Sequence, residues 1–119
     1  NRAFTEVDKT EDPFLSALAL TFIASTQSEV GQNKNYKRTI STALTKALTL
    51  RTRPRALVLA FISSIQAETG DISAAKETIE SAIVAVNMIP DAHSLAPALA
   101  FIGKSLAQID SPTHLRASR

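Results

Sequence analysis

The chain has no cysteine and no tryptophan, and only three glycines and one tyrosine among its 119 residues. Without cysteine it has neither a disulfide nor a thiolate nucleophile, which fits a cytosolic and a bacterial periplasmic location equally well. No glycine-rich phosphate loop is present. The longest apolar run, residues 56–62, is far too short to span a membrane, and no stretch near the start has the form of a signal peptide.

The residues that are present favour helices. Ala, Leu and Ile are abundant, 45% of the residues are apolar and the formal net charge is +2, which indicates one small folded domain. Asp12 followed by Pro13 is a good helix start, and Gly31 and Gly70 are expected to end helices in the left-handed conformation. We predict an extended lead-in over 1–12, one helical domain over 13–110 and a flexible tail over 111–119. Helices are predicted at about 13–30, 34–51, 54–69, 71–89 and 94–109.

A short apolar motif recurs at Phe22, Phe61 and Phe101, with spacings of 39 and then 40 residues. In every copy the phenylalanine is followed by isoleucine. A fixed period of this size predicts an all-α, right-handed solenoid, here of two and a half stacked helical hairpins. The first helix of each pair is apolar nearly all round and the second is amphipathic, as expected if the first is sandwiched. A plain antiparallel five-helix bundle tolerates this pattern but does not explain the copying.

Small and medium-sized residues stand in the second unit where two helices would cross closely. They are Ile62, Ser63, Gly70, Ala75, Ile79 and Ala82. This pattern resembles the tetratricopeptide repeat, although the period is longer than that family's usual 34 or so residues. Two positions depart from the family pattern: Tyr36 replaces a small residue in the first unit, and Asp110 replaces the turn glycine in the third.

The resemblance implies a non-enzymatic module that binds a peptide or protein partner along a groove lined by the first helix of each hairpin. Polar residues that interrupt those apolar helices are the predicted contacts. They are Thr21, Gln27, Ser63, Gln66 and Lys104. The alternative is that these polar side chains bond back to their own backbone inside the fold.

The third unit is incomplete, because only nine residues follow Asp110. Nine residues that include a proline cannot form a full second helix. We therefore predict that an apolar face of the fifth helix is covered by the tail, by a second copy of the chain or by a further segment. The face comprises Leu99, Phe101, Ile102 and Leu106. The corresponding alternative function is a structural or oligomerisation module.

Basic residues are concentrated in the middle of the chain, and no acidic residue lies between Val30 and Ala67. The basic residues of this stretch are Lys34, Lys37, Arg38, Lys46, Arg51, Arg53 and Arg55. They predict either an anion-binding surface, for a nucleic acid or an acidic partner, or an ordinary solvated helix face. Arg51 also fits the end of the second helix, where a cation bonds the last carbonyls. A nucleic-acid surface would lack the exposed aromatic rings on which bases stack.

Nothing in the sequence indicates catalysis, a metal or a cofactor. His93 and His114 fall in a linker and in the tail, and no third ligand accompanies a pair of His or carboxylate residues at metal-binding spacing. Glu77 and Glu80 share a helix face and are interpreted as ordinary solubilising charge. We therefore expect no enzymatic activity.

Overall fold

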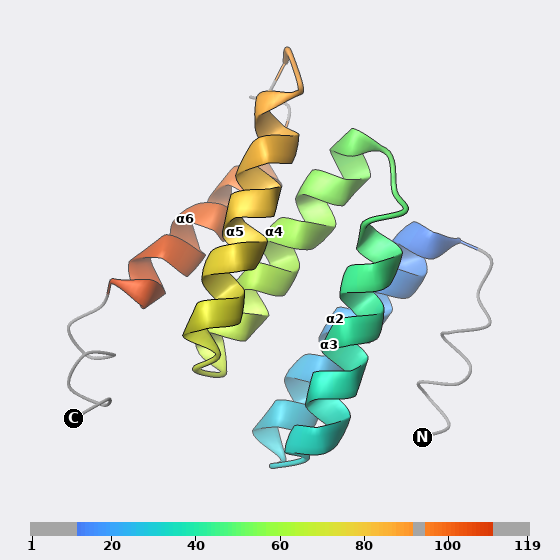
Figure 1. Cartoon of the computed structure of the whole chain (residues 1–119), viewed down its shortest axis with the longest axis vertical. Helices are drawn as coiled ribbons and strands as arrows, with labels where there is room; N and C mark the ends of the chain where they lie inside the picture. The colour runs from blue at the N-terminus through green and yellow to red at the C-terminus, as the bar shows by residue number, and fades with distance from the viewer. Residues whose placement is uncertain (1–11, 92–94, 111–119) are drawn as a thin grey trace.

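The computed structural model describes residues 12–91 and 95–110 of the chain. Within these residues all regular structure is helical, so the predicted all-α class is confirmed (Figure 1). The predicted lead-in at 1–11, the tail at 111–119 and both histidines lie outside the described residues. The helices are α2 (Pro13–Glu29), α3 (Asn33–Ala47), α4 (Thr52–Glu68), α5 (Ile72–Asn87) and α6 (Ala96–Ile109).

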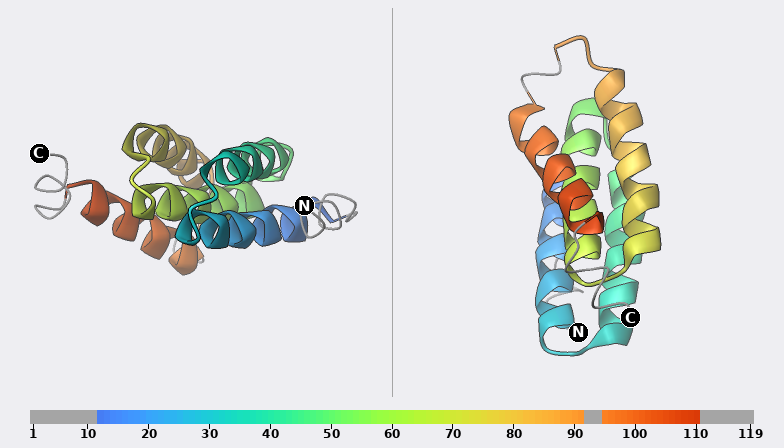
Figure 2. Two further views of the ribbon diagram at one scale, coloured as in Figure 1. Left: turned by 90° about the horizontal axis from the view of Figure 1, so that it is seen from below. Right: turned by 90° about the vertical axis from the view of Figure 1, so that its left-hand side faces the viewer.

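The five helices form two layers. Figure 2 shows α2, α4 and α6 in one layer and α3 and α5 in the other. Each second-layer helix packs chiefly on the helix that precedes it, α3 on α2 and α5 on α4. The fold is accordingly a slab about 17 Å thick, as two helix layers require. No described helix has the length and apolar character needed to cross a bilayer.

Helix α4 lies at the centre and contacts every other described helix. Its buried residues include Ala56 and the continuous run 58–67, which covers all sides of the helix. A helix that is apolar all round must be covered all round, and α2, α3, α5 and α6 together do this. The sequence-based expectation of a sandwiched first helix therefore holds for α4, whereas α2 and α6 are at the two edges of their layer.

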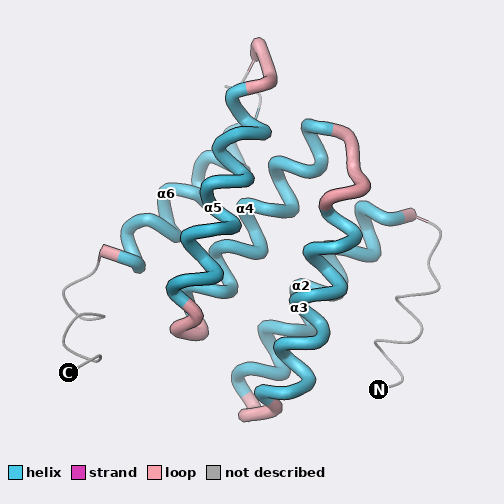
Figure 3. The backbone as a smooth tube through the Cα atoms, in the orientation of Figure 1, coloured by secondary structure: helices cyan, strands magenta, loops and turns pink. Residues whose placement is uncertain are grey.

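The first two hairpins are built alike down to their backbone hydrogen bonds. Gly31 and Gly70 both have a positive φ, 81° and 86°, and each follows the last turn of a first-layer helix. The amide after each glycine donates to a carbonyl five residues back, at Gln27 and Gln66, which is the Schellman arrangement. These turns lie at the same end of the molecule, opposite the connection from α3 to α4 (Figure 3).

The start of α2 also agrees with the sequence. The Asp12 carboxylate accepts hydrogen bonds from the amides of Phe14 and Leu15, at 2.9 and 3.3 Å, and Pro13 is the first helical residue. Asp71 occupies the equivalent capping position before α5, as predicted, but its side chain forms no capping hydrogen bond.

The predicted end of the second helix at Arg51 is wrong, because α3 ends at Ala47. The amides of Thr49 and Leu50 bond three residues back, to Lys46 and Ala47, in tight turns that bury the Leu50 side chain. The Thr49 hydroxyl also donates to the Lys46 carbonyl at 2.7 Å. Helix α5 ends in the same way, with Ile89 buried and its amide bonded to Val86. In both hairpins a buried aliphatic side chain turns the connection inward and so shortens the second helix.

The recurring phenylalanines contact one another in series. The rings of Phe22 and Phe61 are 4.9 Å apart between centroids, and those of Phe61 and Phe101 are 5.2 Å apart. Such spacings are favourable for aromatic pairs. Phe61 is buried beneath its two neighbours, whereas Phe22 is exposed. The period in the sequence thus aligns equivalent residues across α2, α4 and α6.

A matched pair of glycine substitutions tests the local geometry. A Cβ at Gly70 or at Gly103 would have no heavy atom within 4 Å among the described residues, so backbone conformation alone decides its effect. We expect Gly70→Ala to lower the free energy of unfolding by about 1 kcal/mol, because its φ is left-handed. Gly103→Ala, inside α6, should raise it by roughly 0.5–1 kcal/mol. Urea denaturation measures both, and equal effects would contradict the assigned conformations.

Candidate functional site

A groove of about 530 Å³ separates α3 from α5 on the second layer. Leu48 of α3's C-terminal end and Val84 of α5 stand on opposite walls, with exposed fractions of 62% and 61%. The buried side chain of Leu59, from α4, lines the floor. A second hollow bounded by Leu44 and Thr78 extends it toward the middle of the two helices. The volume is in the range of ordinary ligand sites in proteins.

The groove follows from the way the helices of the two layers pack. Helices α3 and α5 are each fixed to a first-layer helix and not chiefly to one another. The helices beneath them therefore set their separation, and the surface of α4 becomes the floor between them. Leu48 and Val84 remain exposed because neither wall reaches across to bury the other.

Three charged side chains also line the groove. Arg55 comes from the first turns of α4, and Glu77 and Glu80 come from α5. The Arg55 guanidinium donates to the carbonyl of Leu50 at 3.4 Å, which holds its stem beside the α3–α4 connection. The site therefore combines an apolar centre with two carboxylates and one guanidinium. Such an arrangement suits a ligand that has an apolar side chain and a neighbouring cationic group.

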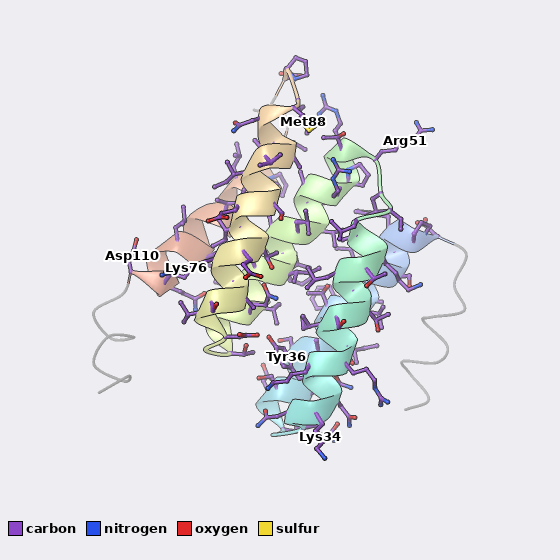
Figure 4. All side chains as sticks on the ribbon, in the orientation of Figure 1. Lys34, Tyr36, Arg51, Lys76, Met88 and Asp110 are labelled. Carbon is purple, nitrogen blue, oxygen red and sulfur yellow. The ribbon has the colours of Figure 1, made fainter. Side chains whose placement is uncertain are left out.

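At the opposite end of α3, Tyr36 bridges the two hairpins. Its hydroxyl lies 2.9 Å from that of Thr69, at the end of α4, and Thr69 itself donates to the Gln66 carbonyl. Figure 4 places Tyr36 between α3 and the α4–α5 turn, where it lines a smaller hollow with Lys37 and Asp71. Burial raises the pKa of the Tyr36 phenol, the Thr69 hydrogen bond opposes this and the Asp71 carboxylate adds to it.

The structure buries four of the five polar residues predicted to contact a partner: Thr21, Gln27, Ser63 and Gln66. Two of them bond to their own helix, the Thr21 hydroxyl to Ala17 at 2.8 Å and the Ser63 hydroxyl to Ala60 at 2.7 Å. Ser63 also bonds Ser105 at 3.0 Å, which joins α4 to α6. These residues therefore lie within the packing and present no surface. The groove of the structure is on the other layer.

Lys104 is the exposed member of the predicted set. Its ammonium group lies 2.7 Å from the carboxylate of Glu68. Both side chains are well exposed, so this ion pair between α6 and α4 contributes at most about 1 kcal/mol.

The basic residues do not form one surface. Lys34 and Arg51 lie at opposite ends of the molecule (Figure 4). Lys34, Lys37 and Arg38 belong to the first turns of α3, and Lys46 to its last turn. Arg51, Arg53 and Arg55 are at the N-terminal end of α4. The helix-dipole explanation for Arg51 is therefore wrong, because this residue precedes a helix and is at the positive end of its dipole.

The predicted face of α6 is divided. Ile102 is buried, and Phe101 is partly buried against the ring of Phe61. Leu99 and Leu106 are both more than 40% exposed, although each is a large apolar residue. The two leucines are seven residues apart and therefore lie on one stripe of the helix.

Leu48 and Val84 were not among the predicted site residues, and Glu77 and Glu80 were interpreted as ordinary surface charge. Each of these residues lies on an amphipathic helix, where periodicity indicates only which side is buried. No local signal shows that two such helices stand apart. The floor residue Leu59 was recognisable only as part of an apolar run.

No group of three or more His, Cys, Asp or Glu residues in the described part of the chain has the geometry to hold a metal ion. In the comparisons with known proteins, no family model, curated protein or solved structure matches the chain.

Titration of the single tyrosine tests the bridge between the hairpins. Because the chain has one tyrosine and no tryptophan, ultraviolet absorbance reports the ionisation of Tyr36 alone. We expect a midpoint above the usual value of 10.0 in the folded protein and a lower midpoint in urea. The raised pKa means that the contribution to stability is complete below pH 10 and is lost as the pH rises through the folded value.

Tyr36→Phe is the control, since it removes the absorbance change. It should also lower the free energy of unfolding by about 1 kcal/mol at neutral pH through loss of the Thr69 hydrogen bond. A midpoint in the folded protein at or below that in urea would contradict the buried position of this phenol.

Proposed function

We propose that this chain is a non-enzymatic helical-repeat module, a divergent tetratricopeptide-like solenoid of two and a half hairpins, that binds a peptide or protein partner. The repeat hypothesis rests on equivalent turns at Gly31 and Gly70 and on the phenylalanine series across three helices. The binding hypothesis rests on one observation above all. Leu48 and Val84 are both exposed and line the same groove, together with the buried side chain of Leu59.

The partner that best fits the groove is a peptide segment with an apolar side chain beside a lysine or arginine. Insertion of the apolar side chain between Leu48 and Val84 would remove both residues from water, at about 25 cal/mol for each Å² buried. Glu77 and Glu80 are near enough to the same space to attract the cationic neighbour. Because the walls are rigid helices, little conformational entropy is lost from the protein on binding.

The proposed binding site is on a different layer from the one that the resemblance implied, which was a groove lined by the first helix of each hairpin. The partner would lie between the second helices of the hairpins, since four of the five polar residues predicted as contacts on the first helices are buried. Binding by shape and charge requires no chemical step. Arg55, which lines the groove, would exclude peptides with a cationic group at that position.

Selection from a random peptide library displayed on phage tests the proposal with a defined probe. Peptides enriched on the wild-type protein should share an apolar residue adjacent to a basic one. When resynthesised and measured by fluorescence anisotropy, they should bind the Leu48→Asp variant at least about tenfold more weakly, because a charge enters the apolar centre. A double Glu77→Gln and Glu80→Gln variant should weaken binding and reduce its dependence on salt.

The matched control is Leu106→Asp, which places the same charge on a comparably exposed leucine of α6, away from the groove. It should leave peptide affinity unchanged. The proposal fails if no peptide is enriched, or if the enriched peptides bind the Leu48→Asp variant as tightly as the wild-type protein.

A further inference from the structure

Equivalent positions in the three first-layer helices differ sharply in burial. The phenylalanine series fixes the register, so Leu20, Leu59 and Leu99 occupy the same position in α2, α4 and α6. Their exposed fractions are 0%, 2% and 42%. The same residue type is fully covered in two helices and open to solvent in the third.

Two further positions repeat this contrast along the same stripe. Ala24 and Ser63 are buried, whereas the equivalent Gly103 is exposed. Gln27 and Gln66 are buried, whereas Leu106 is 43% exposed. The open stripe of α6, Leu99–Gly103–Leu106, is thus one continuous strip about two turns long.

The cover that α6 lacks is the second helix of its hairpin. In the first two hairpins α3 packs on α2 and α5 packs on α4 more extensively than on any other helix. Among the described residues no helix follows α6, whereas the helices that follow α2 and α4, namely α3 and α5, contain 15 and 16 residues. The uncovered face of α6 is equivalent to the face of α4 that α5 covers. The α4–α5 interface therefore shows what kind of helix would fit on α6.

Helices α3 and α5 show what chemistry such a cover requires. Both bury the same pattern at the same spacing: a threonine followed directly by isoleucine, and then an alanine three residues on. The residues are Thr39, Ile40 and Ala43 in α3, and Thr78, Ile79 and Ala82 in α5. Isoleucine supplies apolar area, and alanine allows the two helices to approach closely.

We infer that the open stripe of α6, Leu99–Gly103–Leu106, binds an amphipathic α-helix of a partner protein, in the position that α5 occupies on α4. The partner helix presents isoleucine and alanine three residues apart. Gly103 has no side chain and no neighbour within 4 Å of a built Cβ, so the partner backbone can approach α6 closely. Leu106, where the other repeats have glutamine, makes this stripe more apolar than its counterparts.

A second folded copy of the chain does not supply this helix. Its own isoleucine and alanine stripes are already buried beneath α3 and α5. The exposed stripe of a second copy is another Leu99–Gly103–Leu106. It has leucines on either side of a glycine, unlike the isoleucine and alanine with which α5 packs on α4. The binding site is also separate from the groove between α3 and α5, so either proposal can fail alone.

A synthetic peptide with the sequence of residues 71–89 is the probe, because it presents the α5 pattern in trans. Labelled with a fluorophore and titrated with the intact protein, it should bind saturably and become helical. Binding should weaken at least about tenfold with Leu106→Asp or Gly103→Arg in the protein, and with Ile79→Asp in the peptide. Leu15→Asp in the protein is the matched control, because it places the same charge on an exposed leucine of α2 that belongs to neither proposed surface, and it should have no effect.

Three results overturn the inference. One is the absence of saturable binding. Another is equal binding to the Leu106→Asp and wild-type proteins, because the peptide would then be replacing α5 on α4. The third is a wild-type protein that self-associates in sedimentation experiments and becomes monomeric with Leu106→Asp, since a second copy would then be the occupant.

Discussion

The structure depends on the complete burial of one helix. Residues 58–67 of α4 have almost no accessible surface. Because ten consecutive residues of a helix point to all sides of it, α4 must be covered on every side. Four other helices must therefore surround it, and the contacts show that all four do. At roughly 25 cal/mol for each Å² of apolar surface removed from water, this helix is where hydrophobic stabilisation is most concentrated. Helices α5 and α6 are positioned chiefly by their packing on α4, whereas α3 packs chiefly on α2.

Both candidate interaction surfaces follow from this arrangement. Helices α3 and α5 lie on the same side of the central layer, and their separation leaves the groove whose floor is Leu59. Helix α6 covers α4 through Ile102 and Ser105, and the adjoining stripe at Leu99 and Leu106 is left open. The groove presents apolar walls with flanking charge, whereas the stripe of α6 is apolar and has a glycine at its centre. The two surfaces therefore suit different ligands, an extended or irregular peptide and an amphipathic helix.

Much of the local structure was predictable, because it depends on residues that act locally. Asp12 and Pro13 begin α2, Gly31 and Gly70 follow the ends of α2 and α4, and the predicted boundaries differ from the observed ones mainly at α3. That error arose because the chain leaves α3 in tight turns that bury Leu50, which no local signal in the sequence indicates. Four of the five polar residues predicted as contacts are buried, and the sequence could not show this either. Helical periodicity does not distinguish a polar residue on a ligand-binding surface from one that bonds to its own backbone, as Thr21 and Ser63 do. The groove could not be predicted, since it depends on the distance between two helices.

The most direct test of the account is whether the equivalent phenylalanines of the three proposed repeats contact one another in series, Phe22 with Phe61 and Phe61 with Phe101. Nuclear Overhauser contacts between aromatic rings report this, because the chain has only five phenylalanines and one tyrosine. The account predicts cross-peaks from Phe61 to both Phe22 and Phe101, whose ring centroids lie 4.9 and 5.2 Å from it. Five helices packed in another order would lack at least one of these contacts. If Phe61 contacts only one of the two rings, the proposed stacking of repeats is wrong, and with it the derivation of both surfaces.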